Sequence, residues 1–155
     1  MRPAAPDHPA NANLRRFFEP GYVPGRTPSI AAPDQVVQPY MSLGTHPDLV
    51  ARLWDELPAK LPVDCRAVFF GRPVLAHPTT GIVFGFAGGT HTYALQLPEP
   101  QHSEAIRAGA ERIMQYPVGQ PRVDLDEIGP EWIFGKWFPD EVAWCLAAFE
   151  FAGRE

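Results

Sequence analysis

Cysteine and lysine are scarce in this sequence, whose two cysteines are Cys65 and Cys145 and whose two lysines are Lys60 and Lys136. No Cys-x-x-Cys spacing occurs, so the sequence predicts neither a structural zinc site nor a disulfide framework. No apolar run reaches the roughly 18 residues that a membrane-spanning helix needs, and no apolar leader follows Met1. We therefore expect a soluble, cytoplasmic protein with reduced thiols and no membrane partner.

Motifs of nucleotide-binding and nucleophilic enzymes are absent as well. Residues 85–90 resemble a phosphate-binding loop in their glycine content, but they lack the Gly-Lys-Ser/Thr ending and lead into a predicted strand. Ser29, Ser42 and Ser103 fall outside any Gly-x-Ser-x-Gly elbow, and Cys145 lies in an apolar segment where a thiol is expected to be inert. The sequence therefore favours a non-enzymatic protein with no cofactor and no metal.

Basic charge is low relative to acidic charge. The chain has 13 Lys+Arg against 18 Asp+Glu, a formal net charge of −5. Binding of DNA or RNA needs a concentrated basic face, so we expect no nucleic-acid partner. The hydrophobic share of 45% and the charged share of 20% are ordinary for a globular protein, and 155 residues fit one domain.

Proline, in contrast, is abundant. There are 19 prolines, and eight of them precede residue 40. Because proline interrupts helices and removes hydrogen-bond donors from strands, residues 1–44 are predicted to form an extended N-terminal arm without a regular helix. Phe17, Phe18 and Tyr22 lie in this arm, although disordered tails are poor in aromatic residues. We expect these three rings to anchor the arm on the body, on a second copy of the chain or on a protein partner.

The body, residues 45–155, has alternating periodicities typical of a mixed fold. Apolar residues follow helical spacing after Thr45, and strict alternation marks the segment from His91 to Leu97, where Tyr93, Leu95 and Leu97 share a face. Paired glycines before His91 are typical of a hairpin turn. The expected elements are a helix near 45–57, strands near 65–70, 74–77, 82–86 and 91–97, a helix near 103–115 capped by Ser103, a strand near 132–138 and a helix near 140–152.

This order predicts an α+β fold in which an antiparallel β-meander of about four to five strands packs against two or three helices. The predicted helix at 103–115 has a buried stripe that includes Ile106, Ala110 and Ile113. The last helix is apolar on nearly all sides. A helix of that kind is normally covered on more than one side, so we expect it to lie between the sheet and either the arm or another subunit.

Two histidines form the first candidate site. His77 and His91 flank the predicted strand 82–86, and in one register they approach each other or the acidic loop at 124–127. Histidines with carboxylates suit acid–base chemistry or a transition metal. Neither histidine has a second ligand at helical or strand spacing, however, and both lie beside turns, where histidines are commonly solvated.

An aromatic segment forms the second candidate. Trp132, Phe134, Trp137 and Phe138 lie within seven residues, with Lys136 among them. These side chains either pack in the core or present a recognition surface, since tryptophan is a favoured anchor at interfaces. Lys136 either makes a cation–π contact or extends its charge to water.

Two functional hypotheses follow. The first is a non-enzymatic interaction or assembly module that uses the arm and the aromatic segment to hold a protein partner or a second copy, with a homodimer as the simplest assembly. The alternative is a small ligand-binding domain or enzyme. Its pocket would lie between the sheet and the C-terminal helix, with His77 and acidic residues contributing, and would be lined by Tyr93, His91, Trp132 and Trp137.

Overall fold

The computed structural model describes residues 4–22, 29–36, 38–41, 45–88, 92–114, 123–135 and 140–154. It has an α+β fold built on a six-stranded antiparallel sheet with the strand order β1-β2-β3-β4-β5-β8. The strands of this sheet are β1 (Ile30–Ala31), β2 (Arg66–Phe69), β3 (Arg72–Ala76), β4 (Val83–Gly88), β5 (Thr92–Gln96) and β8 (Trp132–Gly135). The predicted meander is therefore confirmed, and it gains β1 from the N-terminal arm.

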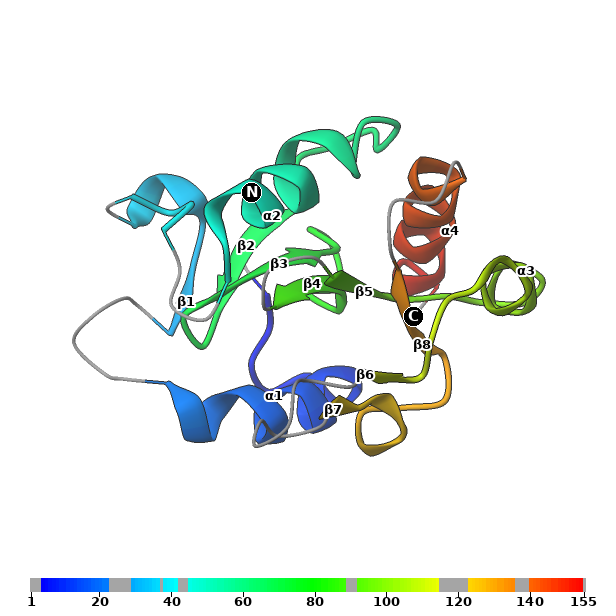
Figure 1. Cartoon of the computed structure of the whole chain (residues 1–155). Helices are drawn as coiled ribbons and strands as arrows, with labels where there is room; N and C mark the ends of the chain where they lie inside the picture. Colours follow the sequence, from blue (N-terminus) through cyan, green and yellow to red (C-terminus); the bar gives the residue numbers. More distant parts are fainter. Residues whose placement is uncertain are drawn as a thin grey trace.

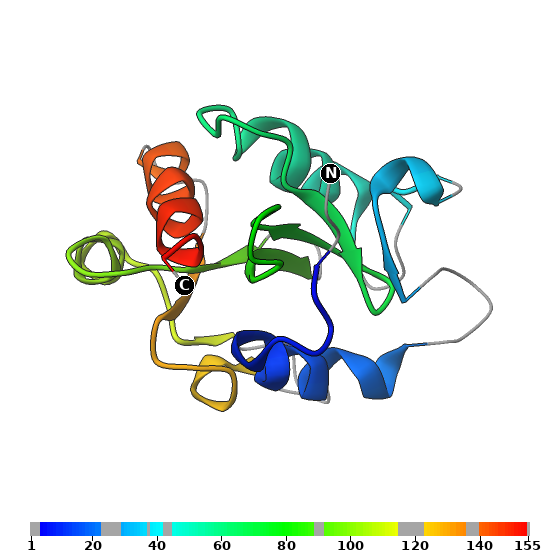
Figure 2. The ribbon, with the colours of Figure 1, turned by 180° about the vertical axis from the view of Figure 1, so that it is seen from behind.

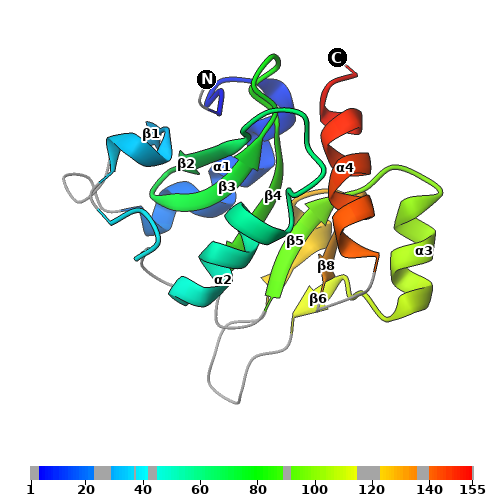
Figure 3. The same ribbon diagram turned by 90° about the horizontal axis from the view of Figure 1, so that it is seen from above.

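Four α-helices pack around the sheet (Figure 1). They are α1 (Ala12–Phe18), α2 (Pro47–Ala51), α3 (Gln101–Ala108) and α4 (Glu141–Ala152), and α2 continues as a π-helical turn over Arg52–Glu56. Helices α2 and α4 lie on one face of the sheet, and α1 lies on the other face (Figures 1 and 3). The predicted alternation of β5 explains this layering, because Tyr93 and Leu95 belong to the core under α2 and α4 while Ala94 belongs to the opposite core.

Helix α2 forms as its sequence predicts. Pro47 occupies the first turn, where its missing N–H costs nothing, and Nδ1 of the preceding His46 accepts a hydrogen bond from the backbone N–H of Asp48 at 3.1 Å. The buried face of the helix is held on the sheet by Trp54, whose indole N–H donates to the carbonyl of Val74 at 2.9 Å.

Helix α3 is shorter than predicted. It ends at Ala108 because Gly109 adopts a left-handed conformation with φ of 113°, which glycine tolerates and other residues rarely adopt. The next residues then form strand β6 (Ile113–Met114), which pairs with β7 (Val123–Asp124) in a two-stranded sheet. The predicted helix to residue 115 is therefore wrong.

The predicted cap of α3 is also wrong, and its predicted buried stripe is wrong at Ile106, although Ala110 beyond the helix is buried. Ser103 lies inside the helix, where its hydroxyl donates to the carboxylate of Glu99 at 2.9 Å, and Pro100 occupies the N-cap. The side of the helix that carries Ile106 faces outward, leaving this residue 38% exposed. Helix α3 therefore rests on the end of the sheet through a narrow contact that includes Ala105.

The N-terminal arm contains a regular helix, contrary to prediction. Helix α1 fits between Pro9, at the start of a preceding 3-10 turn, and Pro20, in the 3-10 turn that follows, so no proline interrupts its hydrogen bonds. Its buried Phe18 packs edge-on against Phe86 with ring centroids 5.1 Å apart. The helix can form because no proline lies between Pro9 and Pro20, although the arm as a whole contains many prolines.

Helix α4 lies on one face of the sheet and keeps an outer side. Trp144, Cys145 and Ala148 are buried toward the sheet, whereas Ala143 and Glu150 are exposed. Since α1 packs on the opposite face of the sheet, the predicted position of this helix between the sheet and the arm helix is wrong (Figure 3). Its apolar composition instead reflects contacts with β4 and β5 on its inner side.

Candidate functional site

The sheet separates two residues that the sequence placed in one pocket. Tyr93 pairs with Gly135 across β5 and β8, and Gln96 pairs with Trp132 in the same ladder. Side chains alternate between the faces of a strand, so Tyr93 points toward α4 and Trp132 points toward α1. These two residues therefore do not line a common pocket.

Tyr93 belongs to a buried polar network. Its hydroxyl donates to Oε2 of Glu141 at 2.5 Å, and the other carboxylate oxygen of Glu141 forms an ion pair with Arg52. Burial of the phenol raises the pKa of Tyr93 above its ordinary value. A Cβ on Gly135 would lie 2.7 Å from the tyrosine ring, so glycine is needed at this position. The network joins α2, β5 and α4, which is a structural role.

Trp132 is a core residue. It is 3% exposed, and its ring centroid lies 5.3 Å from that of Phe86. Phe134 on the same strand is also buried, so for these two residues core packing is the interpretation that the structure supports. His91, Lys136 and Trp137, which were also candidate site residues, lie outside the described residues, as does Phe138.

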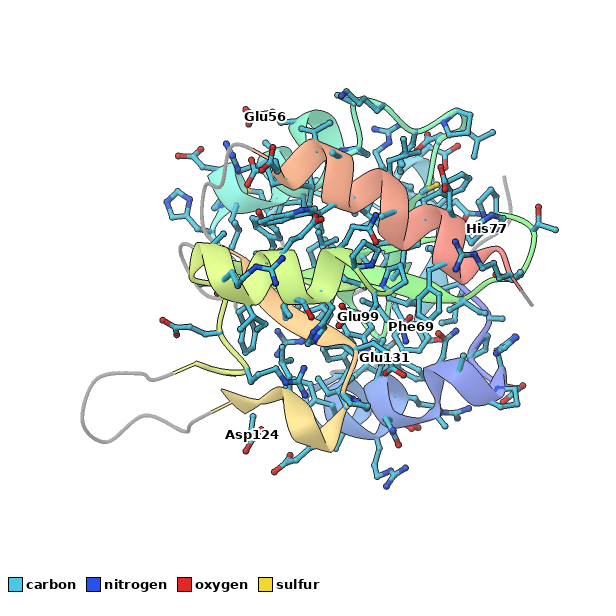
Figure 4. The ribbon with its side chains drawn as sticks, turned by 90° about the vertical axis from the view of Figure 1, so that its right-hand side faces the viewer. Glu56, Phe69, His77, Glu99, Asp124 and Glu131 are labelled. Atoms are coloured by element: carbon cyan, nitrogen blue, oxygen red, sulfur yellow. The ribbon has the colours of Figure 1, made fainter. Side chains whose placement is uncertain are left out.

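His77 packs against α4. Its ring stacks on Phe149 with centroids 4.6 Å apart, and its Nδ1 accepts a hydrogen bond from the backbone N–H of Thr79 at 3.2 Å. Gly153 leaves room for the imidazole, because a Cβ there would lie 2.7 Å from Nε2. Burial lowers the pKa of His77. His77 and Asp124 lie far apart (Figure 4), so this histidine does not face the acidic loop.

The three predicted anchors of the arm all lie near its own sheet. Phe18 is buried, and Phe17 contacts it with a centroid distance of 5.6 Å. The ring of Tyr22 packs edge-on against Phe70 at 5.8 Å. The described part of the arm thus places these aromatics within the same chain.

A pocket that the sequence did not predict lies at the end of the sheet, between the N-terminus of α3 and the C-terminus of α4. It is an open cavity of about 440 Å³. Its lining comes from three separated segments (Figures 3 and 4): the turn after β5 and the start of α3, the turn before β8, and the end of α4. The lining residues that carry its chemistry are Leu97, Glu99, His102, Glu131, Phe151 and Arg154.

Local sequence explains how these segments meet. Pro98 follows the end of β5, and the chain turns directly into α3, which places Glu99 just before that helix and His102 in its first turn. The backbone N–H of Leu97 donates to the carbonyl of Glu131 at 2.9 Å, so the turn before β8 stays beside the turn after β5. Gly153 ends α4 and leaves Arg154 just beyond it.

The pocket carries charges of both signs. Oε1 of Glu99 lies 3.6 Å from Nδ1 of His102 and accepts the hydroxyl hydrogen bond of Ser103. Glu131 and Arg154 line the same cavity, and within the described part of the chain they form no salt bridge with each other or with another side chain. Two opposite charges are therefore presented to the cavity without neutralising each other.

The buried atom of His102 is a further feature of this pocket. The side chain of His102 is 20% exposed, but its Nε2 is buried and has no hydrogen-bond partner among the residues that the structure describes. Buried polar atoms are normally hydrogen-bonded, so this unpaired nitrogen in the wall of the cavity is an unusual feature.

The sequence alone does not predict this pocket, because tertiary contacts bring its lining residues together. The nearest signal was the segment from Pro98 to His102, where a carboxylate, a histidine and two prolines mark the start of a helix. Glu131 and Arg154 are distant in sequence and join it through the β5–β8 pairing and the packing of α4. Without the tertiary contacts, no spacing rule connects these residues.

Among the described residues, no group of three or more histidine, cysteine, aspartate and glutamate side chains is arranged to hold a metal ion. Within that same part of the chain, every helix is too short or too polar to cross a membrane. No protein-family model matches the chain, and neither a curated protein nor a solved structure shows significant similarity to it.

Proposed function

We propose that this protein is a binding domain for a small polar organic molecule, held in the pocket between α3 and α4. The observation that carries this proposal is the cavity of about 440 Å³ on which Glu99, His102, Glu131 and Arg154 converge from three segments. Ligand pockets are typically roughly 300–1,000 Å³ in volume and combine apolar walls with a few convergent polar groups. Leu97 and Phe151 supply apolar wall here.

The chemistry of the lining favours binding over covalent catalysis. The described side chains that line the cavity include no serine, cysteine, threonine or lysine, which are the usual nucleophiles. The two cysteines of the chain are buried elsewhere, and burial raises the pKa of Cys65 to about 12, which keeps its thiol protonated. Reversible recognition through charge and shape is what these residues supply.

The interaction module predicted from the sequence has weaker support. Phe18, Tyr22 and Trp132, for which contact with a partner was one of the alternatives, pack against the sheet of their own chain. Binding of a protein partner and formation of a homodimer stay predictions from the sequence. The pocket supports a ligand-binding function at a different place from the predicted pocket, with His102 rather than His77 or His91 in its lining.

The proposal is tested by nuclear magnetic resonance with the full-length, ¹⁵N-labelled protein and a library of small polar compounds covering both signs of charge. We expect at least one compound to shift the resonances of His102, Glu131 and Arg154 in a saturable manner. The Glu131→Gln variant should weaken this effect. Glu104→Gln is the matched control, because Glu104 is exposed on α3 and does not line the pocket. If no compound shifts these resonances, the protein is not a ligand-binding domain of this kind.

A further inference from the structure

We infer that the pocket between α3 and α4 recognises a small zwitterion, with an ammonium group at Glu131 and Glu99 and a carboxylate at Arg154. This inference rests on the proposed binding function and names the ligand class. Its basis is the pair of opposite charges, Glu131 and Arg154, that line one cavity and that no described salt bridge neutralises.

Glu131 and Arg154 are two opposite charges in the lining of the cavity. Both side chains line the cavity, and oppositely charged side chains within about 4 Å of each other would form a salt bridge. In the described part of the chain no salt bridge joins them, so a gap separates the two charges. A ligand that carries both charges at its ends can bridge this gap and satisfy each group, whereas a singly charged ligand satisfies one of them.

The lining of the cavity contains more than one carboxylate. Glu99 joins Glu131 there, so two carboxylates stand against the single guanidinium of Arg154. An ammonium group has three N–H donors and no acceptor, which suits more than one acceptor on the protein.

Part of the wall of the cavity is apolar. Phe151 lines the cavity and is half-buried, so part of its ring is accessible to a ligand, and aromatic faces attract cations within about 6 Å of the ring centroid. Leu97 is buried beside it and offers apolar surface to the methylene groups between the two charged ends. An ω-amino acid combines these features: an ammonium group, a carboxylate and a short aliphatic chain.

The test compares matched probes on the full-length protein. The probes are the ω-amino acids from 3-aminopropanoate to 6-aminohexanoate, together with the diamine and the dicarboxylate of the same chain length as the tightest binder. Titrations followed by the resonances of His102 and Arg154, at low ionic strength and neutral pH, give the dissociation constants. We expect one ω-amino acid to bind at least about tenfold more tightly than its diamine or its dicarboxylate, because each loses one charge-assisted hydrogen-bonding end.

Variants separate the two ends of the site. Glu131→Gln should weaken the ω-amino acid and the diamine but leave the dicarboxylate unweakened, and Arg154→Gln should weaken the ω-amino acid and the dicarboxylate but not the diamine. Glu99→Gln repeats the first pattern at a second position. Glu104→Gln on the exposed side of α3 should leave all three constants unchanged. Unchanged melting temperatures show that each variant is folded.

Other results of these titrations would contradict either the zwitterion inference or the proposed ligand-binding function. A diamine or dicarboxylate that binds as tightly as the ω-amino acid overturns the zwitterion inference. The zwitterion inference is also overturned if the pocket binds other compounds of the library but none of these probes. In both cases the proposed ligand-binding function stands. If neither the probes nor the library shifts the pocket resonances, the proposed function itself fails, and the inference fails with it.

Discussion

At the scale of single residues, Asn11 makes the most concentrated set of buried contacts in the described part of the arm. Its Nδ2 donates to the carbonyls of Ala5 at 2.7 Å and Gly81 at 2.9 Å, and its Oδ1 accepts from the backbone N–H of Val83 at 2.9 Å. The backbone N–H of Ala5 also donates to the carbonyl of Gly81. Figure 2 shows the described start of the arm, in dark blue, running beside the sheet towards α1. One fully buried amide therefore ties the arm to the start of β4.

Replacing Asn11 by alanine should destabilise the fold by about 1–3 kcal/mol, because the backbone groups at Gly81 and Val83 lose a partner in a place that water does not reach. Chemical denaturation monitored by tryptophan fluorescence measures this change. Asn13→Ala is the matched control, since Asn13 is exposed, donates to the carbonyl of Ile128 and accepts a hydrogen bond from the exposed Arg16. Equal losses in the two variants would show that Asn11 does not hold the arm.

A residue-scale constraint of this kind is not visible in the sequence. Asn11 sits among alanines and prolines, and nothing in its neighbours indicates that its amide reaches Gly81. Gly81 itself lies in a predicted turn, but its need for glycine has two sources: a φ of 77°, and a Cβ position only 2.5 Å from Cβ of Ala5. The turn was predictable from its composition, whereas its contact with the arm was not.

At the scale of elements, periodicity decided which predictions succeeded. The alternation in β5 and the helical spacing in α2 predicted elements that the structure confirms, because each buries one face against the sheet. Helix α3 failed, since its apolar residues beyond Gly109 fit a helical stripe by chance while the glycine ends the helix. The pocket depends on where α3 ends and α4 lies, and these are tertiary outcomes.

The turn between β3 and β4 links α4 to the arm. Its Thr80 hydroxyl donates to the carbonyl of Ala152 at 3.0 Å, and its His77 ring stacks on Phe149, while Gly81 receives the arm on the other side. This turn therefore holds two elements that approach it from opposite faces of the sheet. Any change in the charge of His77 acts on this junction.

The stability of the protein should depend on the protonation of His77. Burial lowers the pKa of His77 below its ordinary value of 6.5, so the unfolded chain binds this proton more readily than the folded protein. The neutral ring of His77 contributes to the free energy of unfolding above pH 6.5. This contribution is lost as the pH falls through the pKa of His77 in the folded protein. Lowering the pH from 7 to 5 should therefore destabilise the wild type more than His77→Phe, which keeps the stacking on Phe149.

The measurement is the free energy of unfolding of the two proteins at several pH values in this window. Other groups titrate in both proteins, so the difference between the two curves isolates His77. Protonation would also remove the acceptor for the N–H of Thr79, which acts in the same direction. Parallel curves for the two proteins would show that His77 has the same pKa in the folded and unfolded chains.

At the scale of the whole molecule, the sheet is covered on both faces, and the N-terminal arm supplies the cover of one of them. The core on the α1 side contains Leu14 and Phe18 together with residues of β2, β3, β4 and β8. Residues 1–44 were predicted as a separate arm that docks on a body. The described contacts make helix α1 part of the core, because a sheet face this apolar would otherwise be open to water.

Removing residues 1–26 should therefore lower the stability of the protein substantially. Burial of each large apolar side chain contributes about 1.5–3 kcal/mol, and the deletion removes both Leu14 and Phe18 from the core. Phe18→Ala tests the same point within the full chain and should cost about 3–5 kcal/mol, as expected for truncation of a buried phenylalanine. Arg16→Ala on the exposed side of α1 is the control. A deletion variant as stable as the full chain, together with an unaffected Phe18→Ala, would show that α1 does not cover the sheet in solution and would restore the arm as a segment available to a partner.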